Sequence, residues 1–279
     1  MKKAILSLSL ISVLLGSCSG TTLSFPSGNS TAVANEAVDY ETAKALYAEV
    51  LATYVDETGF VDYEGLQQNR QPLDQYNAAL AAVTEETYNT WTEAEQIAFW
   101  MNAYNSVTLA SIINQEPLKD SIKDIVGVWR ITKHPVRGEA RTLDNIEHQQ
   151  LRVDFNEPRL HAAIVCAAVS CPPLRAEPFT GENLDAQLEE QVVQFLAKPD
   201  GLKIDKGEGV VHLSTIFKWF GEDWIPTYGT DEGFAGNESE RAVLNFISNY
   251  VSEEDQAYLQ EGDYQVKYID YDWSLNIQG

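Results

Sequence analysis

Residues 92–114 read TEAEQIAFWMNAYNSVTLASIIN, and this stretch decides the fold. Thr92 followed three residues later by Glu95 is typical of a capping box, in which each side chain satisfies a backbone amide of the other at a helix start. Beyond this cap, apolar residues recur on nearly every side of the expected helix. A helix that is apolar all round is buried. The sequence therefore predicts a central, buried helix over about 93–114.

Two amides interrupt this apolar helix, at Asn102 and Asn105. A buried amide needs hydrogen-bond partners, because leaving its donors and acceptors unpaired is costly. One interpretation is that both side chains hold neighbouring loops in place. The other is that Asn102 serves as an active-site amide that orients a catalytic group.

A second apolar stretch, LHAAIVCAAVSCPPLR at 160–175, carries His161, Cys166 and Cys171. A continuous apolar run indicates a buried segment. Ionisable groups are rarely placed in such a segment without a structural or chemical reason. We therefore expect the reactive residues of a functional site to lie in this stretch.

The spacing of His161 and Cys166 does not by itself make a catalytic pair. Residues five apart point to opposite faces of a strand, and they differ by about 140° around a helix. The two side chains meet only if the chain bends between them. A helix beginning near Cys166 would also lower the pKa of its thiol and favour the nucleophilic thiolate. The base could equally be His148, brought in by the fold.

Several interpretations of Cys166 and Cys171 remain open. The two sulfurs can form a structural disulfide if the chain turns between them. Alternatively, Cys166 is a reactive thiol and Cys171 is buried or resolving. A metal site with His161 or His148 is less favoured, because the paired C-x-x-C knuckles of zinc sites are absent, and inert buried thiols are the last alternative. We predict no metal and no cofactor.

A further helix is expected from Leu143 to about Arg152, capped by Thr142. His148 and Arg152 are four residues apart and share a face of this helix. Glu147 is adjacent to His148, so the two side chains point about 100° apart and do not pair with each other. Glu147 and His148 are either a surface pair or an orienting carboxylate and a catalytic base.

The remaining segments predict an α+β fold, a mostly helical single domain with a small antiparallel sheet. No composition break or internal repeat divides it. The other helices are expected at 37–54, 67–83, 183–197, 216–220, 238–250 and 253–259. Strands are expected in two hairpins, 126–131 with 135–141 and 202–205 with 209–213, and at 264–269.

The first residues predict export and lipidation. Met1-Lys2-Lys3 is basic, the next residues are apolar, and small residues precede Cys18, as in a secretory signal peptide. A cysteine at this place resembles the lipobox of bacterial lipoproteins, which implies that Cys18 is acylated. We predict a signal peptide at 1–17, a flexible lipid-anchored tether at 18–35 and a domain at 36–279.

These features favour the cell envelope as the location. Ser19 is not the aspartate that retains many lipoproteins at the inner membrane, which favours the periplasmic face of the outer membrane. The expected membrane contact is the lipid on Cys18, because no other run is apolar and long enough to span a bilayer. In an oxidising compartment, Cys166 and Cys171 either pair or stay reduced for a purpose.

Charge and motifs exclude several functions. The 279 residues include 19 basic and 42 acidic ones, a net charge of -23, which repels phosphate backbones and argues against nucleic-acid binding. Much of this charge is expected to form a solvated surface. No phosphate-binding glycine loop, H-E-x-x-H or G-x-S-x-G is present. This argues against kinases, Rossmann dehydrogenases, zincins and common serine hydrolases.

Several segments spread along the chain match the pattern of a known family: GFVDY at 59–63, AFWMNAYN at 98–105, LDNIEH at 143–148 with 151–152, 159–174, IFKWF at 216–220 and 268–276. Taken together, they resemble the DUF547 family. That resemblance implies shared histidines and cysteines but no established reaction, with relatives that are secreted in bacteria or intracellular in eukaryotes. If intracellular relatives share both cysteines, an obligatory disulfide becomes less natural and a reactive thiol gains support. Met101 lies where the resemblance implies an aliphatic residue, and Phe220 lies where it implies a tyrosine.

Our leading functional hypothesis is a thiol-dependent hydrolase or transferase acting on a peptide-like substrate. Cys166 would be the nucleophile and His161 or His148 the base. Glu147 or Asn102 would orient the base. The alternative is a non-catalytic module that binds a small molecule or peptide and is closed by a Cys166–Cys171 disulfide.

Overall fold

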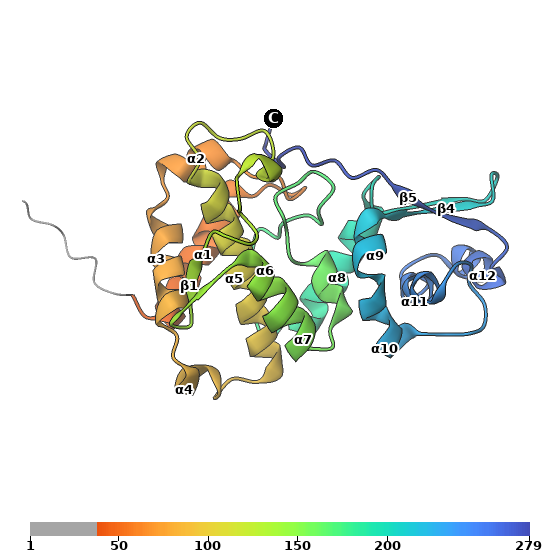
Figure 1. Cartoon of the computed structure of the whole chain (residues 1–279), viewed down its shortest axis with the longest axis horizontal. Coiled ribbons are helices and arrows are strands. Elements are labelled where there is room, and N and C mark those ends of the chain that lie inside the picture. The colour runs from red at the N-terminus through yellow and green to blue at the C-terminus, as the bar shows by residue number, and fades with distance from the viewer. Residues whose placement is uncertain (1–37) are drawn as a thin grey trace, which may run out of the picture. The chain divides into compact units, whose positions relative to one another are not determined.

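The computed structural model describes residues 38–279, which Figure 1 draws in colour. The predicted signal peptide, the acylated Cys18 and the tether to residue 35 lie outside these residues. Within the part described, no helix has both the length and the apolar character needed to cross a membrane.

The predicted central helix is confirmed as α5 (Glu93–Ile113). Thr92 is its N-cap, and the capping box with Glu95 is formed in both directions. Every residue from Ile97 to Ile113 is buried, because α2, α3, α6, η2 and α8, whose bounds are given below, all pack against the helix. Its all-round apolar sequence is thus explained by an all-round protein environment.

Four helices of the first third of the chain precede α5 and enclose part of it. α1 lies against α3, and both α2 and α3 contact α5. The predicted helix at 67–83 is divided at Asn69 and Arg70, since Pro72 suits the first turn of a new helix and not the interior of an old one. The bounds are α1 (Tyr40–Tyr54), α2 (Tyr63–Gln68), α3 (Gln71–Ala82) and α4 (Glu85–Tyr88).

The first predicted hairpin is only partly correct. Strands β1 (His134–Val136) and β2 (Glu139–Arg141) pair antiparallel around Arg137 and Gly138, which both have positive φ as a tight two-residue turn requires. The expected strand at 126–131 is wrong, because that segment forms turns after the short 3-10 helix η1 (Ile122–Asp124). Trp129 and its neighbours are thus placed on a loop.

The helix predicted at 143–152 is present but irregular. α6 (Leu143–Asn145) passes into a π-helix, η2 (Ile146–Leu151), and then into α7 (Arg152–Asp154). The Arg152 amide donates to the carbonyl of Glu147, five residues earlier. π-Helical turns are rare and are frequently found at functional sites.

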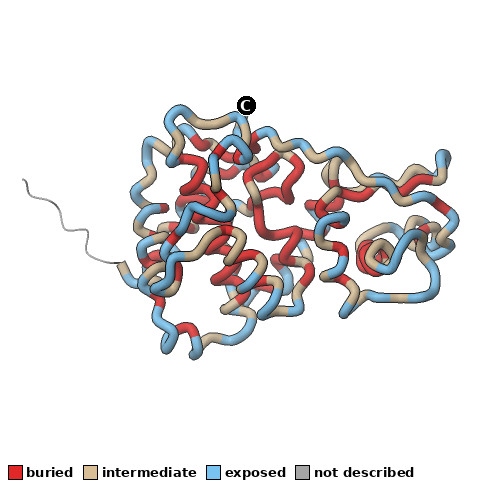
Figure 2. The backbone as a smooth tube through the Cα atoms, viewed as in Figure 1, coloured by how far each residue is buried: buried red, intermediate tan, exposed pale blue. Residues whose placement is uncertain are grey.

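The stretch at 160–175 is mostly buried, as its apolar run predicts, but it is neither a strand nor an α-helix. It begins in the 3-10 helix η3 (Pro158–Ala162) and continues as irregular chain. Figure 2 shows this segment as a buried strip through the middle of the molecule. A buried irregular backbone needs side chains to satisfy its polar groups.

Three side chains supply those hydrogen bonds. Asn105 donates to the carbonyl of Ala163 and accepts from the amide of Val165. Gln191 donates to the carbonyls of Ala162 and Pro173, and Lys198 donates to those of Val169 and Cys171. The stretch is therefore held in one conformation by neighbouring helices.

The C-terminal half combines helices with a three-stranded sheet. β3 (Leu202–Asp205) and β4 (Val210–Ser214) form the second predicted hairpin, and β5 (Gln265–Ile269) joins β4 in parallel. This sheet is mixed, whereas we expected an antiparallel one. The helical elements here are α8 (Leu184–Ala197), α9 (Thr215–Phe220), η4 (Gly221–Trp224), α10 (Ile225–Tyr228), α11 (Glu238–Ile247) and α12 (Glu253–Glu261).

The chain after β5 runs back across the molecule to the N-terminal elements (Figure 1). Leu275 bridges Ala168, and Ile277 bridges Val61. Asn276 accepts a hydrogen bond from the hydroxyl of Tyr63, 2.7 Å away. The described chain is thus a mostly helical α+β fold with small sheets and a central buried helix, which confirms the predicted class.

Candidate functional site

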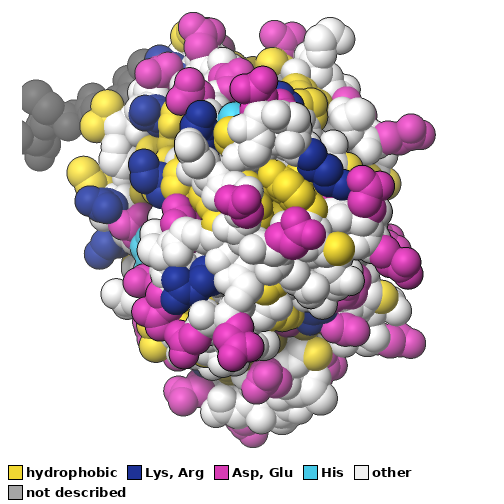
Figure 3. Space-filling view, turned by 90° about the vertical axis from the view of Figure 1, so that its right-hand side faces the viewer, with side chains coloured by type: hydrophobic (Ala, Val, Ile, Leu, Met, Phe, Trp, Pro, Cys, Tyr) yellow, Lys and Arg dark blue, Asp and Glu magenta, His cyan; other side chains and the backbone are white. Residues whose placement is uncertain are grey.

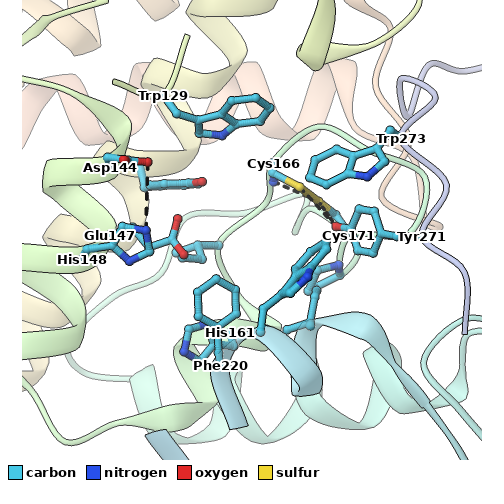
Figure 4. Close-up of a pocket in the computed structure, with 15 residues that line it drawn as sticks. Trp129, Asp144, Glu147, His148, His161, Cys166, Cys171, Phe220, Tyr271 and Trp273 are labelled. Atoms are coloured by element: carbon cyan, nitrogen blue, oxygen red, sulfur yellow. Dashed lines mark hydrogen bonds and ion pairs between the residues drawn. A yellow bond between two sulfur atoms is a disulfide. The ribbon is translucent and has the colours of Figure 1, made fainter. Parts of the chain in front are cut away.

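A cavity of about 230 Å³ lies where the π-helix, the 160–175 stretch, α9 and the C-terminal segment meet. Figure 4 shows its acidic residues and histidines opposite a group of aromatic rings and the cysteine pair. The cavity is lined by Tyr104, Trp129, Asp144, Glu147, His148, His161, Ile164, Cys166, Cys171, Pro172, Ile216, Trp219, Phe220, Tyr271 and Trp273.

His161 is fixed beneath the cavity by Asp223. Its Nε2 lies 2.7 Å from Asp223 Oδ2, its ring stacks on Phe220 with centroids 4.4 Å apart, and only 3% of the residue is exposed. The short helix η3 brings His161 to this position, and η4 supplies Asp223. A histidine oriented by a carboxylate is a common arrangement for a catalytic base.

Arg152 joins this pair to the second histidine. Its Nε and Nη2 make a bidentate pair with Asp223, at 2.6 and 2.8 Å, and its Nη1 lies 3.1 Å from Nδ1 of His148. His161, Asp223, Arg152 and His148 therefore form one hydrogen-bonded chain along the cavity. The predicted shared face of His148 and Arg152 is confirmed by their direct contact.

The protonation states in this chain follow from its charges. Burial alone would raise the pKa of Asp223, but hydrogen bonds from His161 and Arg152 hold it well below its usual value. Burial lowers the pKa of His161, against the opposing effect of Asp223. Because Arg152 already balances the charge of Asp223, a second buried cation gains little there. His161 is therefore neutral, donates its Nε2 hydrogen and keeps a lone pair on Nδ1.

His148 is also neutral near pH 7. Burial and the charge of Arg152 both lower its pKa. Arg152 is a donor only, so Nδ1 of His148 accepts, and its ring proton lies on Nε2, 4.0 Å from Asp144. Its lone pair is thus occupied, which makes His148 a less available base than His161.

Glu147 is the buried carboxyl of the cavity wall. Burial raises its pKa to about 7, while a hydrogen bond with Tyr104 and the charge of Arg152 act in the opposite direction. Its carboxyl points into the space between the labelled side chains of Figure 4. A carboxyl that titrates near neutral pH inside a cavity is suited to proton transfer.

Cys166 and Cys171 are joined as a disulfide in the wall of the same cavity. The Cys166 amide donates to the Cys171 sulfur at 3.0 Å, and the Tyr271 hydroxyl lies 3.2 Å from one sulfur and 3.1 Å from the other. Cys171 is 2% exposed, whereas Cys166 is only partly buried. Cys166 is therefore the more accessible sulfur.

Four aromatic rings that line the cavity pack against one another. Tyr271 and Trp273 have centroids 4.6 Å apart, and Trp219 lies 4.9 Å from Tyr271 and 5.7 Å from Trp273. Trp129 meets Trp273 edge-on at 6.0 Å. We call Trp129, Trp219, Tyr271 and Trp273 the aromatic wall.

Comparison with known proteins bears on the larger part of this cavity. Residues 88–196 match the family model DUF547, described as a protein of unknown function. No curated protein sequence and no solved structure matches the chain. The segment matching DUF547 contains both cysteines, His148 and His161 of the cavity, and the family resemblance of the sequence is supported there.

The DUF547 segment does not complete the cavity alone. Trp219, Phe220, Tyr271 and Trp273 all follow residue 196, and so does Asp223, the partner of His161. The remaining chain thus supplies most of the aromatic wall and the carboxylate that orients the histidine.

The predicted site residues divide into two groups. Cys166, His161, His148 and Glu147 all line the cavity. Asn102 lies elsewhere, where its amide donates to the carbonyl of Phe179 and accepts from that residue's amide, at 2.8 and 2.9 Å. The structure thus places Asn102 as a clamp on a loop and away from the cavity.

The chain bends after Cys166 but begins no helix there. Ala167 has a φ of 60°, in the left-handed region that side chains disfavour. The helix-start mechanism expected for a lowered thiol pKa is therefore absent. The polar neighbours of the two sulfurs are instead the Cys166 amide and the Tyr271 hydroxyl.

Sequence reasoning missed Asp223 and Tyr271. Asp223 is 62 residues from His161, and Tyr271 is 105 residues from Cys166, so no local spacing indicates either contact. The available signals were the aromatic residues at 216–224 and 268–273, and the segment 268–276, which contains Tyr271 and resembles DUF547. In residues 38–279, no three His, Cys, Asp or Glu side chains are grouped so that they could hold a metal ion.

Proposed function

We propose that this protein is a thiol-dependent hydrolase or transferase that acts on a peptide-like substrate. The observation that carries the proposal is that Cys166 and an Asp223-bound His161 line one cavity. A nucleophile, a base and an orienting carboxylate within one site are the parts that acyl transfer by a thiol requires.

The reaction begins from the reduced pair. An external dithiol supplies two electrons and two protons to the disulfide and leaves as a disulfide itself. Cys166 then transfers its proton to Nδ1 of His161, and its sulfur attacks the substrate carbonyl. The carbon–sulfur bond forms, and the leaving group takes the proton from His161. Water or another nucleophile then releases the acyl group and restores the thiol.

Other groups of the cavity support this assignment. The Tyr271 hydroxyl is placed to donate to a thiolate at either cysteine, because it lies within 3.2 Å of both sulfurs. Glu147 provides a second proton-transfer group with a pKa of about 7.

Acylation with p-nitrophenyl acetate tests the proposal. The protein is reduced with dithiothreitol, desalted and mixed with the ester, and the site of acetylation is mapped by mass spectrometry. We expect transient acetylation of Cys166, its loss in Cys166→Ser and a strong decrease in His161→Gln. Cys171→Ser is the matched control, since it keeps Cys166 free and should still acylate. Acetylation spread over surface lysines, with none on Cys166, would contradict the proposal.

We further propose that the chain is anchored in the cell envelope through an acylated Cys18, at the periplasmic face of the outer membrane. The basic start, the apolar run and the small residues before Cys18 support this. Labelling of cells with an alkynyl fatty acid should mark the wild-type chain and leave Cys18→Ala unmarked. Membrane fractionation then distinguishes the inner from the outer membrane.

The alternative is a non-catalytic binding module closed by the Cys166–Cys171 disulfide. The disulfide of the structure favours it, because a bonded sulfur is not a nucleophile. Peptide mapping without reductant distinguishes the two functions. A quantitative disulfide in protein isolated from the envelope, together with an unaltered phenotype of a folded Cys166→Ser variant, would favour the binding module.

A further inference from the structure

We propose that the cavity binds an organic ammonium group, seated between the aromatic wall and Glu147. This deepens the proposed function by naming the part of the substrate that is recognised, such as the amine of a lysine side chain or of a peptide N-terminus. The inference rests on the proposed function only in calling the bound compound a substrate. Binding of the ammonium group itself does not need a free thiol.

The aromatic wall supplies the main attraction. Aromatic faces carry negative quadrupole potential, so a cation within about 6 Å of several rings is stabilised by each of them. Trp219, Tyr271 and Trp273 lie within 6 Å of one another, measured between centroids. Trp129 closes one side of this group. Neutral apolar groups also suit such a wall, so the rings alone do not select a cation.

The carboxylate of Glu147 makes the site prefer a cation over a neutral group. Its carboxyl faces the cavity, and Tyr271 and Trp273 of the aromatic wall lie on the far side (Figure 4). The other charges nearby are already paired. Asp144 is bonded to Arg130 at 2.8 Å, and Arg152 is bonded to Asp223 and Glu222. The charge of Glu147 has no such cationic partner among the side chains that line the cavity.

One cation already contacts the aromatic wall. Lys123 Nζ lies 5.0 Å from the ring of Trp273, and Lys123 is exposed and does not line the cavity. This contact shows that a ring of the wall can hold an ammonium group.

Cavity size and long-range charge agree with a single ammonium group. Ligand cavities that enclose a whole drug-sized molecule have roughly 300–1,000 Å³, and this one has about 230 Å³. It therefore accepts one end of a larger substrate. Acidic side chains are spread over the face seen in Figure 3, and the net charge of -23 attracts cations and repels anions.

Calorimetric titration with choline tests this inference. The neutral probe is 3,3-dimethylbutan-1-ol, which has the shape of choline but carries carbon in place of the charged nitrogen. The full protein is used with its disulfide intact, at pH 8, where Glu147 is ionised. We expect choline to bind with a dissociation constant in the millimolar range or below, about tenfold more tightly than the alcohol.

Variants separate the two parts of the site. Glu147→Gln should remove the preference for choline over the alcohol, and Trp219→Leu should weaken choline about fivefold or more. Trp219 is 43% exposed, so its replacement spares the core. Glu139→Gln removes an exposed carboxylate of β2 and is the matched control, expected to bind as wild type. Circular dichroism verifies that each variant is folded.

Equal binding of choline and the alcohol by the wild type, or no binding of either, would overturn the inference. An unchanged choline affinity in both Glu147→Gln and Trp219→Leu would do so as well. Choline binding and acetylation of Cys166 together distinguish failure of the proposed function from failure of this inference. Choline binding without acetylation of Cys166 contradicts the thiol chemistry alone, and acetylation without choline binding contradicts the ammonium site alone.

Discussion

His161 and Asp223 are joined by a hydrogen bond of 2.7 Å across 62 residues of chain. This contact links a 3-10 helix within the DUF547 segment to a second one beyond it. Through Arg152 it also reaches His148 on the π-helix. Three separate elements of the cavity therefore depend on one carboxylate.

Asp223→Asn should destabilise the fold by roughly 2–3 kcal/mol, because it leaves Arg152 with a neutral partner in a largely buried place. Urea unfolding at pH 7 measures the loss. The pKa of Asp223 is held below its ordinary value of 3.8, so its contribution is complete above about pH 4 and decreases as the pH falls further. Glu222→Gln is the control, since Glu222 also contacts Arg152 but is 72% exposed, and a loss below about 0.5 kcal/mol is expected.

Glu147→Gln should stabilise the protein at pH 8 and have little effect near pH 4. The pKa of Glu147 is about 7 in the fold, against an ordinary value of 4.5. Between these values the folded state holds a proton that the unfolded state has lost, so wild-type stability decreases as the pH rises and levels off above pH 7. The full difference is on the order of 3 kcal/mol. Urea unfolding of the wild type and of Glu147→Gln from pH 4 to 8 measures this effect. A difference in unfolding free energy that stays constant with pH would contradict the raised pKa of Glu147.

Asn105→Ala should loosen the irregular stretch that carries the cysteines. It removes the hydrogen bonds to Ala163 and Val165, and the orphaned backbone groups cost roughly 2–4 kcal/mol. Hydrogen exchange of the Val165 amide should accelerate. Asn102→Ala, one turn earlier on the same helix, removes an equivalent clamp on Phe179. It should leave that amide protected, and equal acceleration in both variants would contradict the assignment.

Gly59→Ala should cost more than 2 kcal/mol. Gly59 has a φ of 81°, and an added Cβ would lie 2.5 Å from the backbone nitrogen of Leu174. The variant therefore combines a disfavoured conformation with a clash against the end of the cysteine stretch. Gly209→Ala separates the two causes. Gly209 has a φ of 62° but open space around it, so about 1 kcal/mol is expected from conformation alone.

Tyr271→Phe should slow alkylation of Cys166 by iodoacetamide in the reduced protein at pH 7. The hydroxyl lies within hydrogen-bond distance of both sulfurs, and removing a donor to a thiolate raises the pKa of the thiol. We expect a decrease of roughly threefold to tenfold in rate. Tyr264→Phe removes a hydroxyl that donates to the carbonyl of Leu259, away from the cavity lining, and should alkylate as wild type.

Local signals in the sequence were sufficient for most of the longer helices and for the second hairpin. The capping box of Thr92 and Glu95 and the apolar residues that follow determine α5 without reference to other parts of the chain. Thr142 likewise starts its helix as expected. These features could be predicted because each depends on residues within a few positions of one another.

The candidate site could be predicted only in part. His161, Cys166 and Cys171 were evident as ionisable groups in an apolar run, and Glu147 and His148 as neighbouring residues of an expected helix. The bend that brings them to one cavity is set by Asn105, Gln191 and Lys198. The π-helix and the Asp223 contact depend on tertiary packing, which overrides local preference.

The return of the C-terminal segment has a kinetic consequence. Tyr63 meets Asn276 across 213 residues, and Tyr271 and Trp273 enter the cavity on the same segment. Contacts of such sequence separation carry a loop-closure entropy cost, so we expect them to form late in folding. A chain in which this segment has not yet docked has neither the complete aromatic wall nor the hydroxyl beside the sulfurs.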